Sequence, residues 1–131
     1  MEVVVVTGLA KNGEAMEKRR CQLYVDGFRM LYNPAERDPH PRNITDSVRR
    51  DILFMRKFFP IGRFFYFTNS DHAINALRVL RFEGKIDVLK IKHFGPDGKE
   101  YDIDVDADGE PSSYPEGFLD EWPAMMARLA K

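Results

Sequence analysis

The sequence predicts an α/β fold with a mixed sheet, and three observations lead to this expectation. Apolar runs at residues 2–7 and 64–68 have the β-branched and aromatic composition of strands. Between them, apolar residues recur at helical spacing, and a later Gly-Pro-Asp-Gly turn separates two alternating runs. We therefore expect a single domain over residues 1–131 with two main helices, a C-terminal β-hairpin and a short final helix.

The first third of the chain predicts strands and then an irregular loop. The four consecutive valines of residues 2–7 do not alternate with polar residues, which is typical of a strand buried on both faces. Residues 21–25 alternate and end at an Asp-Gly turn, and residues 28–32 form another short apolar run. Because prolines interrupt regular structure, we expect residues 33–41 to form a loop. The loop contains Pro34, Pro39 and Pro41.

The first main helix is expected to begin at a cap provided by Thr45 or Asp46 and to end before Pro60. Leu53 and Phe54 widen its apolar face. The residues that define this face by their helical spacing are Val48, Ile52, Met55 and Phe59.

The second main helix is expected to begin at Ser70 or Asp71 and to stop at Gly84. The strands at 87–94 and 101–105 flank the four-residue turn and predict the hairpin. Residues 122–129 then predict a short helix.

Composition and charge exclude several classes of protein. With 44% hydrophobic and 31% charged residues, the chain is neither disordered nor membrane-spanning in composition. A formal charge of −1 excludes attraction of the whole molecule to nucleic acid or anionic lipid. The single cysteine, Cys21, excludes an internal disulfide framework and favours a reducing compartment. We expect a cytoplasmic protein.

A glycine-rich segment after the first strand has the spacing of a phosphate-binding P-loop but lacks its chemistry. Gly8 and Gly13 match the two glycines of that motif. A P-loop continues with lysine and serine or threonine, whereas Glu14 and Ala15 occupy these positions. Because a carboxylate repels phosphate, we interpret this segment as an ordinary connection.

An acidic run near the C-terminus partly matches a calcium-binding loop. Counting from Asp104, acidic residues occupy the first, third and fifth positions and Gly109 the sixth. The twelfth position is Pro115, and Glu116 comes one place late for a bidentate ligand. We favour an exposed strand in which the aspartates of 102–108 alternate with inward apolar residues.

The histidines and serines do not form a recognisable catalytic or metal motif. His40, His72 and His93 lack the spacing that places two zinc ligands on one helix face. Ser70 lacks the glycines of a nucleophile elbow. His72 follows Asp71 at a strand-to-helix corner, where we interpret it as a capping or surface residue.

Charge is distributed unevenly along the chain. Residues 42–63 contain six basic and two acidic residues, and residues 97–121 contain ten acidic and one basic. This asymmetry either balances within the molecule or steers a head-to-tail or partner contact. A weaker hypothesis is nucleic-acid binding through the basic residues. These are Arg42, Arg49, Arg50, Arg56, Lys57 and Arg63.

A series of segments between about residues 28 and 121 ends in an acidic-glycine run and a Tyr-Pro-Glu-Gly-Phe-Leu-Asp motif. The segments are 31–35, 40–42, 67–75, 83–86, 106–110 and 114–120. In order, they resemble the C-terminal half of the ABC/SMC-like AAA ATPases of bacterial anti-phage and overcoming-lysogenization-defect-type systems.

The resemblance implies the fold of that family without its activity. By motif position, the magnesium-binding acid falls on Tyr32, the catalytic glutamate on Ala35 with Glu36 one place late, and the γ-phosphate sensor on Asn69. Phosphoryl transfer depends on positioned lysine, magnesium and water-orienting groups, so their loss should abolish hydrolysis. We expect no cofactor.

Two functions follow as hypotheses. The first is a non-catalytic, pseudo-ATPase-like interaction module that regulates, inhibits or self-associates within a bacterial defence or mobile-element system. Its contact residues would be Tyr114, Phe118 and Trp122, unless these aromatics pack onto their own sheet. The second is a nucleotide-binding or hydrolytic subunit whose site a partner chain completes. Its remnant site would contain Glu36, Asn69, Ser70, Asp71 and His72.

Overall fold

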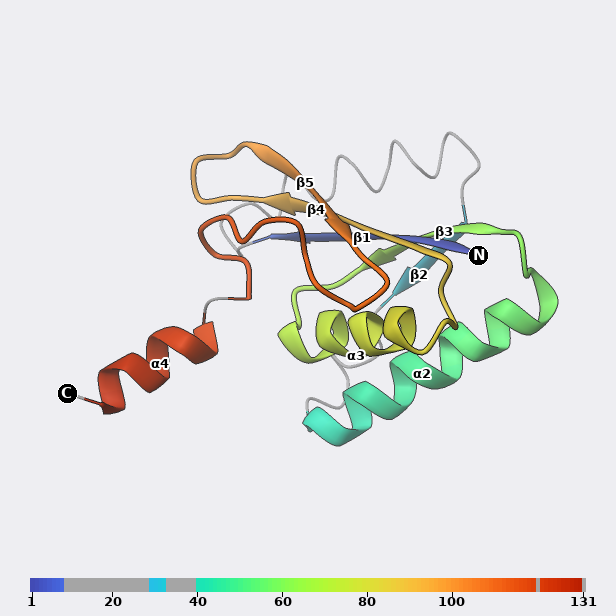
Figure 1. The fold of residues 1–131 in the computed structure, drawn as a ribbon, viewed down its shortest axis with the longest axis horizontal. Helices are drawn as coiled ribbons and strands as arrows, with labels where there is room; N and C mark the ends of the chain where they lie inside the picture. The colour runs from blue at the N-terminus through green and yellow to red at the C-terminus, as the bar shows by residue number, and fades with distance from the viewer. Residues whose placement is uncertain (9–28, 33–39, 120, 131) are drawn as a thin grey trace.

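A mixed five-stranded sheet in the order β2-β3-β1-β4-β5 forms the centre of the computed structural model, which describes residues 1–8, 29–32, 40–119 and 121–130 (Figure 1). The parallel part consists of β2 (Arg29–Tyr32), β3 (Arg63–Phe67), β1 (Glu2–Gly8) and β4 (Val88–Phe94). The last strand, β5 (Glu100–Val105), pairs antiparallel with β4. The predicted α/β fold with a mixed sheet is confirmed.

Strand β1 is buried on both faces, as its run of valines predicts. Val3 and Val5 pack against the helices, in the same apolar cluster as Phe64 and Ile91. On the opposite face, Val4 and Val6 join a second cluster. Its other members are Phe65, Phe67 and Phe94. Two apolar layers therefore meet at β1, which pairs with β3 on one side and β4 on the other.

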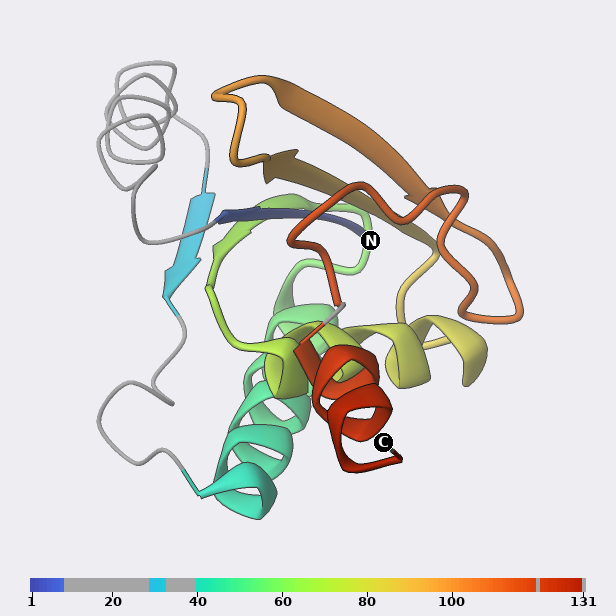
Figure 2. The same ribbon diagram turned by 90° about the vertical axis from the view of Figure 1, so that its left-hand side faces the viewer.

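Two helices, α2 (Pro41–Phe58) and α3 (Asp71–Phe82), cover one face of the sheet (Figures 1 and 2). Val48 and Ile52 of α2 and Leu77 of α3 are fully buried against it. A short helix, α4 (Glu121–Leu129), follows β5 and projects away from the sheet and its two helices (Figure 1).

Helix α2 begins earlier than predicted. Its first residue is Pro41, and the cap is His40, whose Nδ1 accepts a hydrogen bond from the Arg42 amide at 3.2 Å. Proline suits the first helical position because its φ is already helical and its missing N–H would have no partner there. The expected caps at Thr45 or Asp46 and the assignment of Pro41 to a loop are therefore wrong.

The remaining boundaries agree closely with the sequence expectations. Ser70 caps α3 by accepting a hydrogen bond from the Ala73 amide at 3.3 Å, and Gly84 with φ of +75° follows its end. Gly98 with φ of +78° closes the hairpin turn between β4 and β5. The predicted strand at 21–25 and the P-loop-like residues Gly13, Glu14 and Ala15 lie outside the described residues.

The acidic run forms an exposed strand and turn, as interpreted from its alternation. Ile103 and Val105 are buried, whereas the aspartates between and beside them are exposed. Beyond β5, Asp106 Oδ1 accepts hydrogen bonds from the amides of Asp108 at 2.9 Å and Glu110 at 3.0 Å. This carboxylate therefore closes a local turn.

A side-chain bond at the hairpin turn predicts pH-dependent stability. Tyr101 Oη donates to Asp97 Oδ2 at 2.5 Å, which lowers the pKa of Asp97 below its usual 3.8 and raises that of Tyr101. The bond therefore stabilises the fold at neutral pH and its contribution is lost as pH falls through the lowered pKa of Asp97. We expect Tyr101→Phe to melt at a lower temperature than wild type near neutrality, with the difference disappearing in strong acid. A constant difference across this range would contradict the assignment.

Candidate functional site

The carboxyl ends of β1 and β3 lie side by side at one edge of the sheet. The register pairs Val6 with Phe67, so the chain leaves both strands at the same level. Asn69 Oδ1 then accepts a hydrogen bond from the Gly8 amide at 3.1 Å, which joins the two strand ends. In open α/β sheets this edge is where ligands bind.

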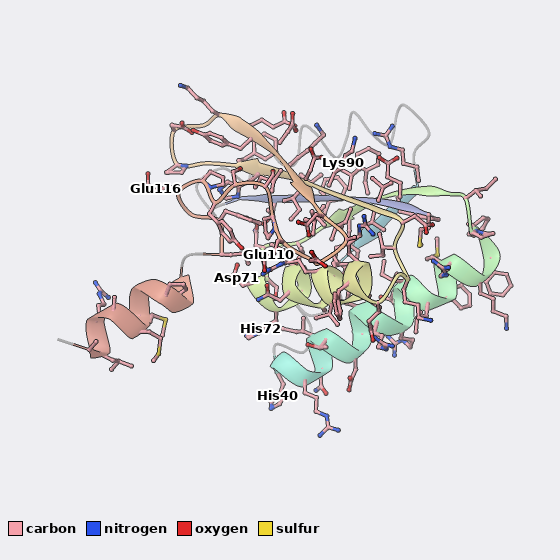
Figure 3. All side chains as sticks on the ribbon, in the orientation of Figure 1. His40, Asp71, His72, Lys90, Glu110 and Glu116 are labelled. Carbon is pink, nitrogen blue, oxygen red and sulfur yellow. The ribbon has the colours of Figure 1, made fainter. Side chains whose placement is uncertain are left out.

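The polar side chains at this edge mostly bind the chain's own backbone. Thr68, which is buried, accepts a hydrogen bond from the Ser70 amide through Oγ1 at 3.0 Å. Ser70 in turn caps α3. Asp71 and His72 occupy the first turn of that helix, where His72 is exposed (Figure 3). These hydrogen bonds connect the end of β3 to the start of α3.

The structure brings together four of the predicted remnant-site residues and leaves the fifth undescribed. Residues 69–72 follow β3 as one corner. Glu36 and Ala35 lie outside the described residues. Tyr32 ends β2 and pairs with Phe67, so the position that the resemblance gives to a magnesium-binding acid is on the strand next to β3.

Sequence reasoning missed the role of His93 on β4. This side chain is 1% exposed, its Nε2 lies 3.1 Å from the Glu116 carbonyl oxygen, and its Nδ1 is buried without a hydrogen-bond partner. Its ring packs against Phe118 with centroids 5.5 Å apart. His93 therefore holds the segment after β5 against the sheet. No spacing in the sequence indicates this contact between residues 23 positions apart.

Of the three aromatic residues proposed as contacts, the structure describes the side chains of two, and these differ in burial. Phe118 is 1% exposed and belongs to the core, so it follows the alternative in which the segment packs onto its own sheet. Tyr114 is exposed, and its ring lies 6.0 Å from that of Phe118. Trp122 is in α4, and its side chain lies outside the described part of the structure.

Four of the six predicted basic residues interact with polar groups of the chain itself. Arg49 pairs with Glu83 at 2.5 Å, and Arg63 pairs with Glu2 at 2.9 Å. Arg56 donates to the Lys85 carbonyl oxygen at 2.7 Å. Arg50, although exposed, pairs with Asp51 at 3.6 Å. The other two, Arg42 and Lys57, are exposed. Such a scattered set resembles a solvated helix face more than a nucleic-acid groove.

An exposed apolar cluster lies at the C-terminal end of α2. Its members, here named the α2-end cluster, are Phe54, Phe58, Phe59 and Ile61, with exposed fractions of 59%, 55%, 36% and 96%. The rings of Phe54 and Phe58 lie one helical turn apart with centroids 4.8 Å apart. Lys57 Nζ lies 5.8 Å from the Phe58 centroid.

The assignment of Phe54 to the apolar face that packs on the core is therefore wrong, whereas Phe59, although 36% exposed, places its ring 6.2 Å from that of buried Phe64. Val48 and Ile52 form the buried stripe, whereas Phe54 and Phe58 form a second stripe on another side of the helix. On a helix, residues two positions apart point in different directions. Phe54 is two positions after Ile52, and this spacing already indicated that the two side chains lie on different sides of the helix.

Comparison with protein-family models, curated proteins and solved structures finds no match to any of them. The relation to ABC/SMC-like ATPases therefore stays a prediction. Among the described residues, no helix is long and apolar enough to cross a membrane. Within the same residues, no group of three His, Cys, Asp or Glu side chains is placed to hold a metal ion.

The hydrogen bond between Asn69 and Gly8 predicts that substitutions at Asn69 and at nearby His72 change the free energy of unfolding by different amounts. Asn69→Ala leaves the part-buried Gly8 amide without its acceptor, and we expect it to lower the free energy of unfolding by about 1–3 kcal/mol. The exposed His72→Ala should change it by less than about 0.5 kcal/mol. Urea unfolding of both variants checks this. Equal changes in the free energy of unfolding would show that the Asn69 hydrogen bond does not stabilise this edge of the sheet.

Proposed function

We propose that this chain acts as a non-catalytic protein-interaction module that docks through the α2-end cluster. The observation that carries the proposal is the exposure of Phe54 and Phe58, whose rings contact each other, with exposed Ile61 shortly after the end of the helix. Clustered exposed aromatics of this kind mark binding sites because they bury large apolar areas on contact.

The surroundings of the α2-end cluster indicate the chemistry of the partner. Lys57 lies against the Phe58 ring and is exposed. Arg50, one helical turn before Phe54, is also exposed but pairs with Asp51 at 3.6 Å. An apolar centre beside an exposed lysine suits a partner surface that is apolar in the middle with an acidic residue at its edge.

The carboxyl edge of the sheet supports the alternative nucleotide-binding function less well. Asn69 and Ser70 already accept hydrogen bonds from backbone amides of the chain. A ligand at this edge would compete with these bonds. Regulation or inhibition of a defence or mobile-element ATPase, which the sequence resemblance implies, is compatible with docking through a surface helix and is part of the proposal.

Site-specific photocrosslinking in cells tests the proposed function. A photoreactive phenylalanine analogue at position 58 should form discrete protein adducts, because that ring is 55% exposed within the α2-end cluster. The same analogue at Asp46, an exposed position near the other end of α2, is the matched control. Adducts that are no stronger at 58 than at 46 would contradict a docking role for the cluster.

A further inference from the structure

Helix α4 presents a second exposed apolar face. Met125 and Met126 are each 45% exposed, and Leu129 is 79% exposed. Met125 and Leu129 lie one turn apart, so these side chains form one short stripe. An amphipathic helix that projects from the molecule with its apolar stripe uncovered is suited to binding a surface groove or a second helix.

We propose that the apolar stripe of α4 packs on the α2-end cluster of a second copy of this chain, which produces a head-to-tail contact. This inference rests on the proposed function, because it gives the partner of the same docking surface.

The two surfaces lie at opposite ends of the molecule. Along the longest axis, α4 is at one extreme and the C-terminal end of α2 is at the other (Figure 1). The view along that axis agrees, since α4 is nearest the viewer there (Figure 2). The stripe therefore cannot cover the α2-end cluster of its own chain as folded here. A contact between them has to join two copies.

Charge favours this pairing of ends. The segment 97–121, which leads into α4, contains ten acidic residues and one basic residue. Of these acids, Glu116 is exposed and lies on the α4 side of the molecule (Figure 3). In the sequence, Asp120 and Glu121 stand directly before and at the start of α4, against one basic residue, Arg128, in its last turn. The α2-end cluster is bordered instead by exposed Lys57. The acids at the start of α4 in one copy are thus attracted to the basic residue beside the cluster of the next.

A competing surface for α4 has the wrong charge. A shallow groove of about 530 Å³ lies between α3 and the turn after β5, and it exposes Val79 and Phe82. Its one basic lining residue, Arg78, already donates to the Gly109 carbonyl oxygen at 2.7 Å and pairs with Glu110 at 3.5 Å. The lining also contains the acidic Asp108, which repels the acidic residues that precede α4.

The proposed contact is heterologous, because different surfaces of the two copies meet. Such a contact leaves one free surface of each kind at the ends and adds further copies until a ring closes or a filament forms. The two apolar faces are short, which places the interface at the small end of the range, below about 1,200 Å² in total. We expect reversible association that rises with protein concentration.

Variants that remove one surface at a time test the proposal. Phe54→Gln with Phe58→Gln removes the α2 side, and Met125→Gln with Leu129→Gln removes the α4 side. All four residues are exposed and glutamine is a good helix former, so both variants should fold like wild type in circular dichroism. By sedimentation velocity, wild type should form species larger than a dimer, and each variant alone should be monomeric.

An equimolar mixture of the two variants is the decisive sample. Each variant retains the surface that the other lacks, so one intact interface can form, and the mixture should give a dimer and nothing larger. A wild-type monomer at high concentration, or a mixture that stays monomeric, would overturn the proposal. Persistent dimers of the α4-side variant alone would indicate instead that two α2-end clusters meet.

Val79→Gln with Phe82→Gln is the matched control, because it removes two exposed apolar residues from the α3 groove. It should associate like wild type, and loss of association would place α4 in that groove and contradict the proposal. Failure here is distinguishable from failure of the proposed function. A monomeric chain that still crosslinks to another protein at position 58 would disprove self-association alone.

Discussion

The burial of β1 on both of its faces is the constraint on which the rest of the structure depends. Four consecutive valines leave no polar side for water, so apolar layers are needed above and below the strand. Helices α2 and α3 supply one layer. They differ in length, with 18 residues against 12, which corresponds to about 27 Å against about 18 Å at 1.5 Å per residue. The longer helix extends past its neighbour, and its end carries the exposed phenylalanines (Figure 1).

The hydrogen-bonding side chains around the sheet mainly connect the ends of its strands to neighbouring segments. Asn69 joins the ends of β1 and β3, and Ser70 starts the helix that follows. At the same end of the sheet, His93, which pairs with Thr7 of β1, fixes the segment that precedes α4. These contacts make the sheet and its connections a rigid support. On this support, α2 presents exposed apolar and charged side chains.

Local patterns predicted the strands and the hairpin because each pattern reflects a local cause. The valine run, the Ser70 cap and the glycines of the turns act within a few residues. The start of α2 was missed because Pro41 breaks a helix in its interior but favours the first position. Periodicity placed Val48, Ile52 and Met55 on the stripe of α2 that packs on the core. It could not show that Phe54 lies outside this stripe, since the width of the buried face depends on tertiary packing. The same reason hid the contact of His93 with Phe118.

The fold shows where the unevenly distributed charges of the sequence lie. Basic residues gather on α2, whereas acidic residues follow along β5, the turn after it and the segment that leads into α4, where Glu116 lies (Figure 3). The two ends of the molecule carry uncovered apolar surfaces, on α2 and on α4. Charge alone would give a weak attraction that salt screens. Apolar area alone would hold two copies together without selecting their relative orientation. Together they favour one orientation of neighbouring copies.

Small-angle X-ray scattering over a range of protein concentrations measures that orientation most directly. Until a ring closes, copies joined end to end make a particle whose maximum dimension grows with each added copy while its cross-section stays constant. The account predicts this growth, and its suppression by high salt. A maximum dimension that does not change with concentration, or a compact dimer of larger cross-section, would contradict it.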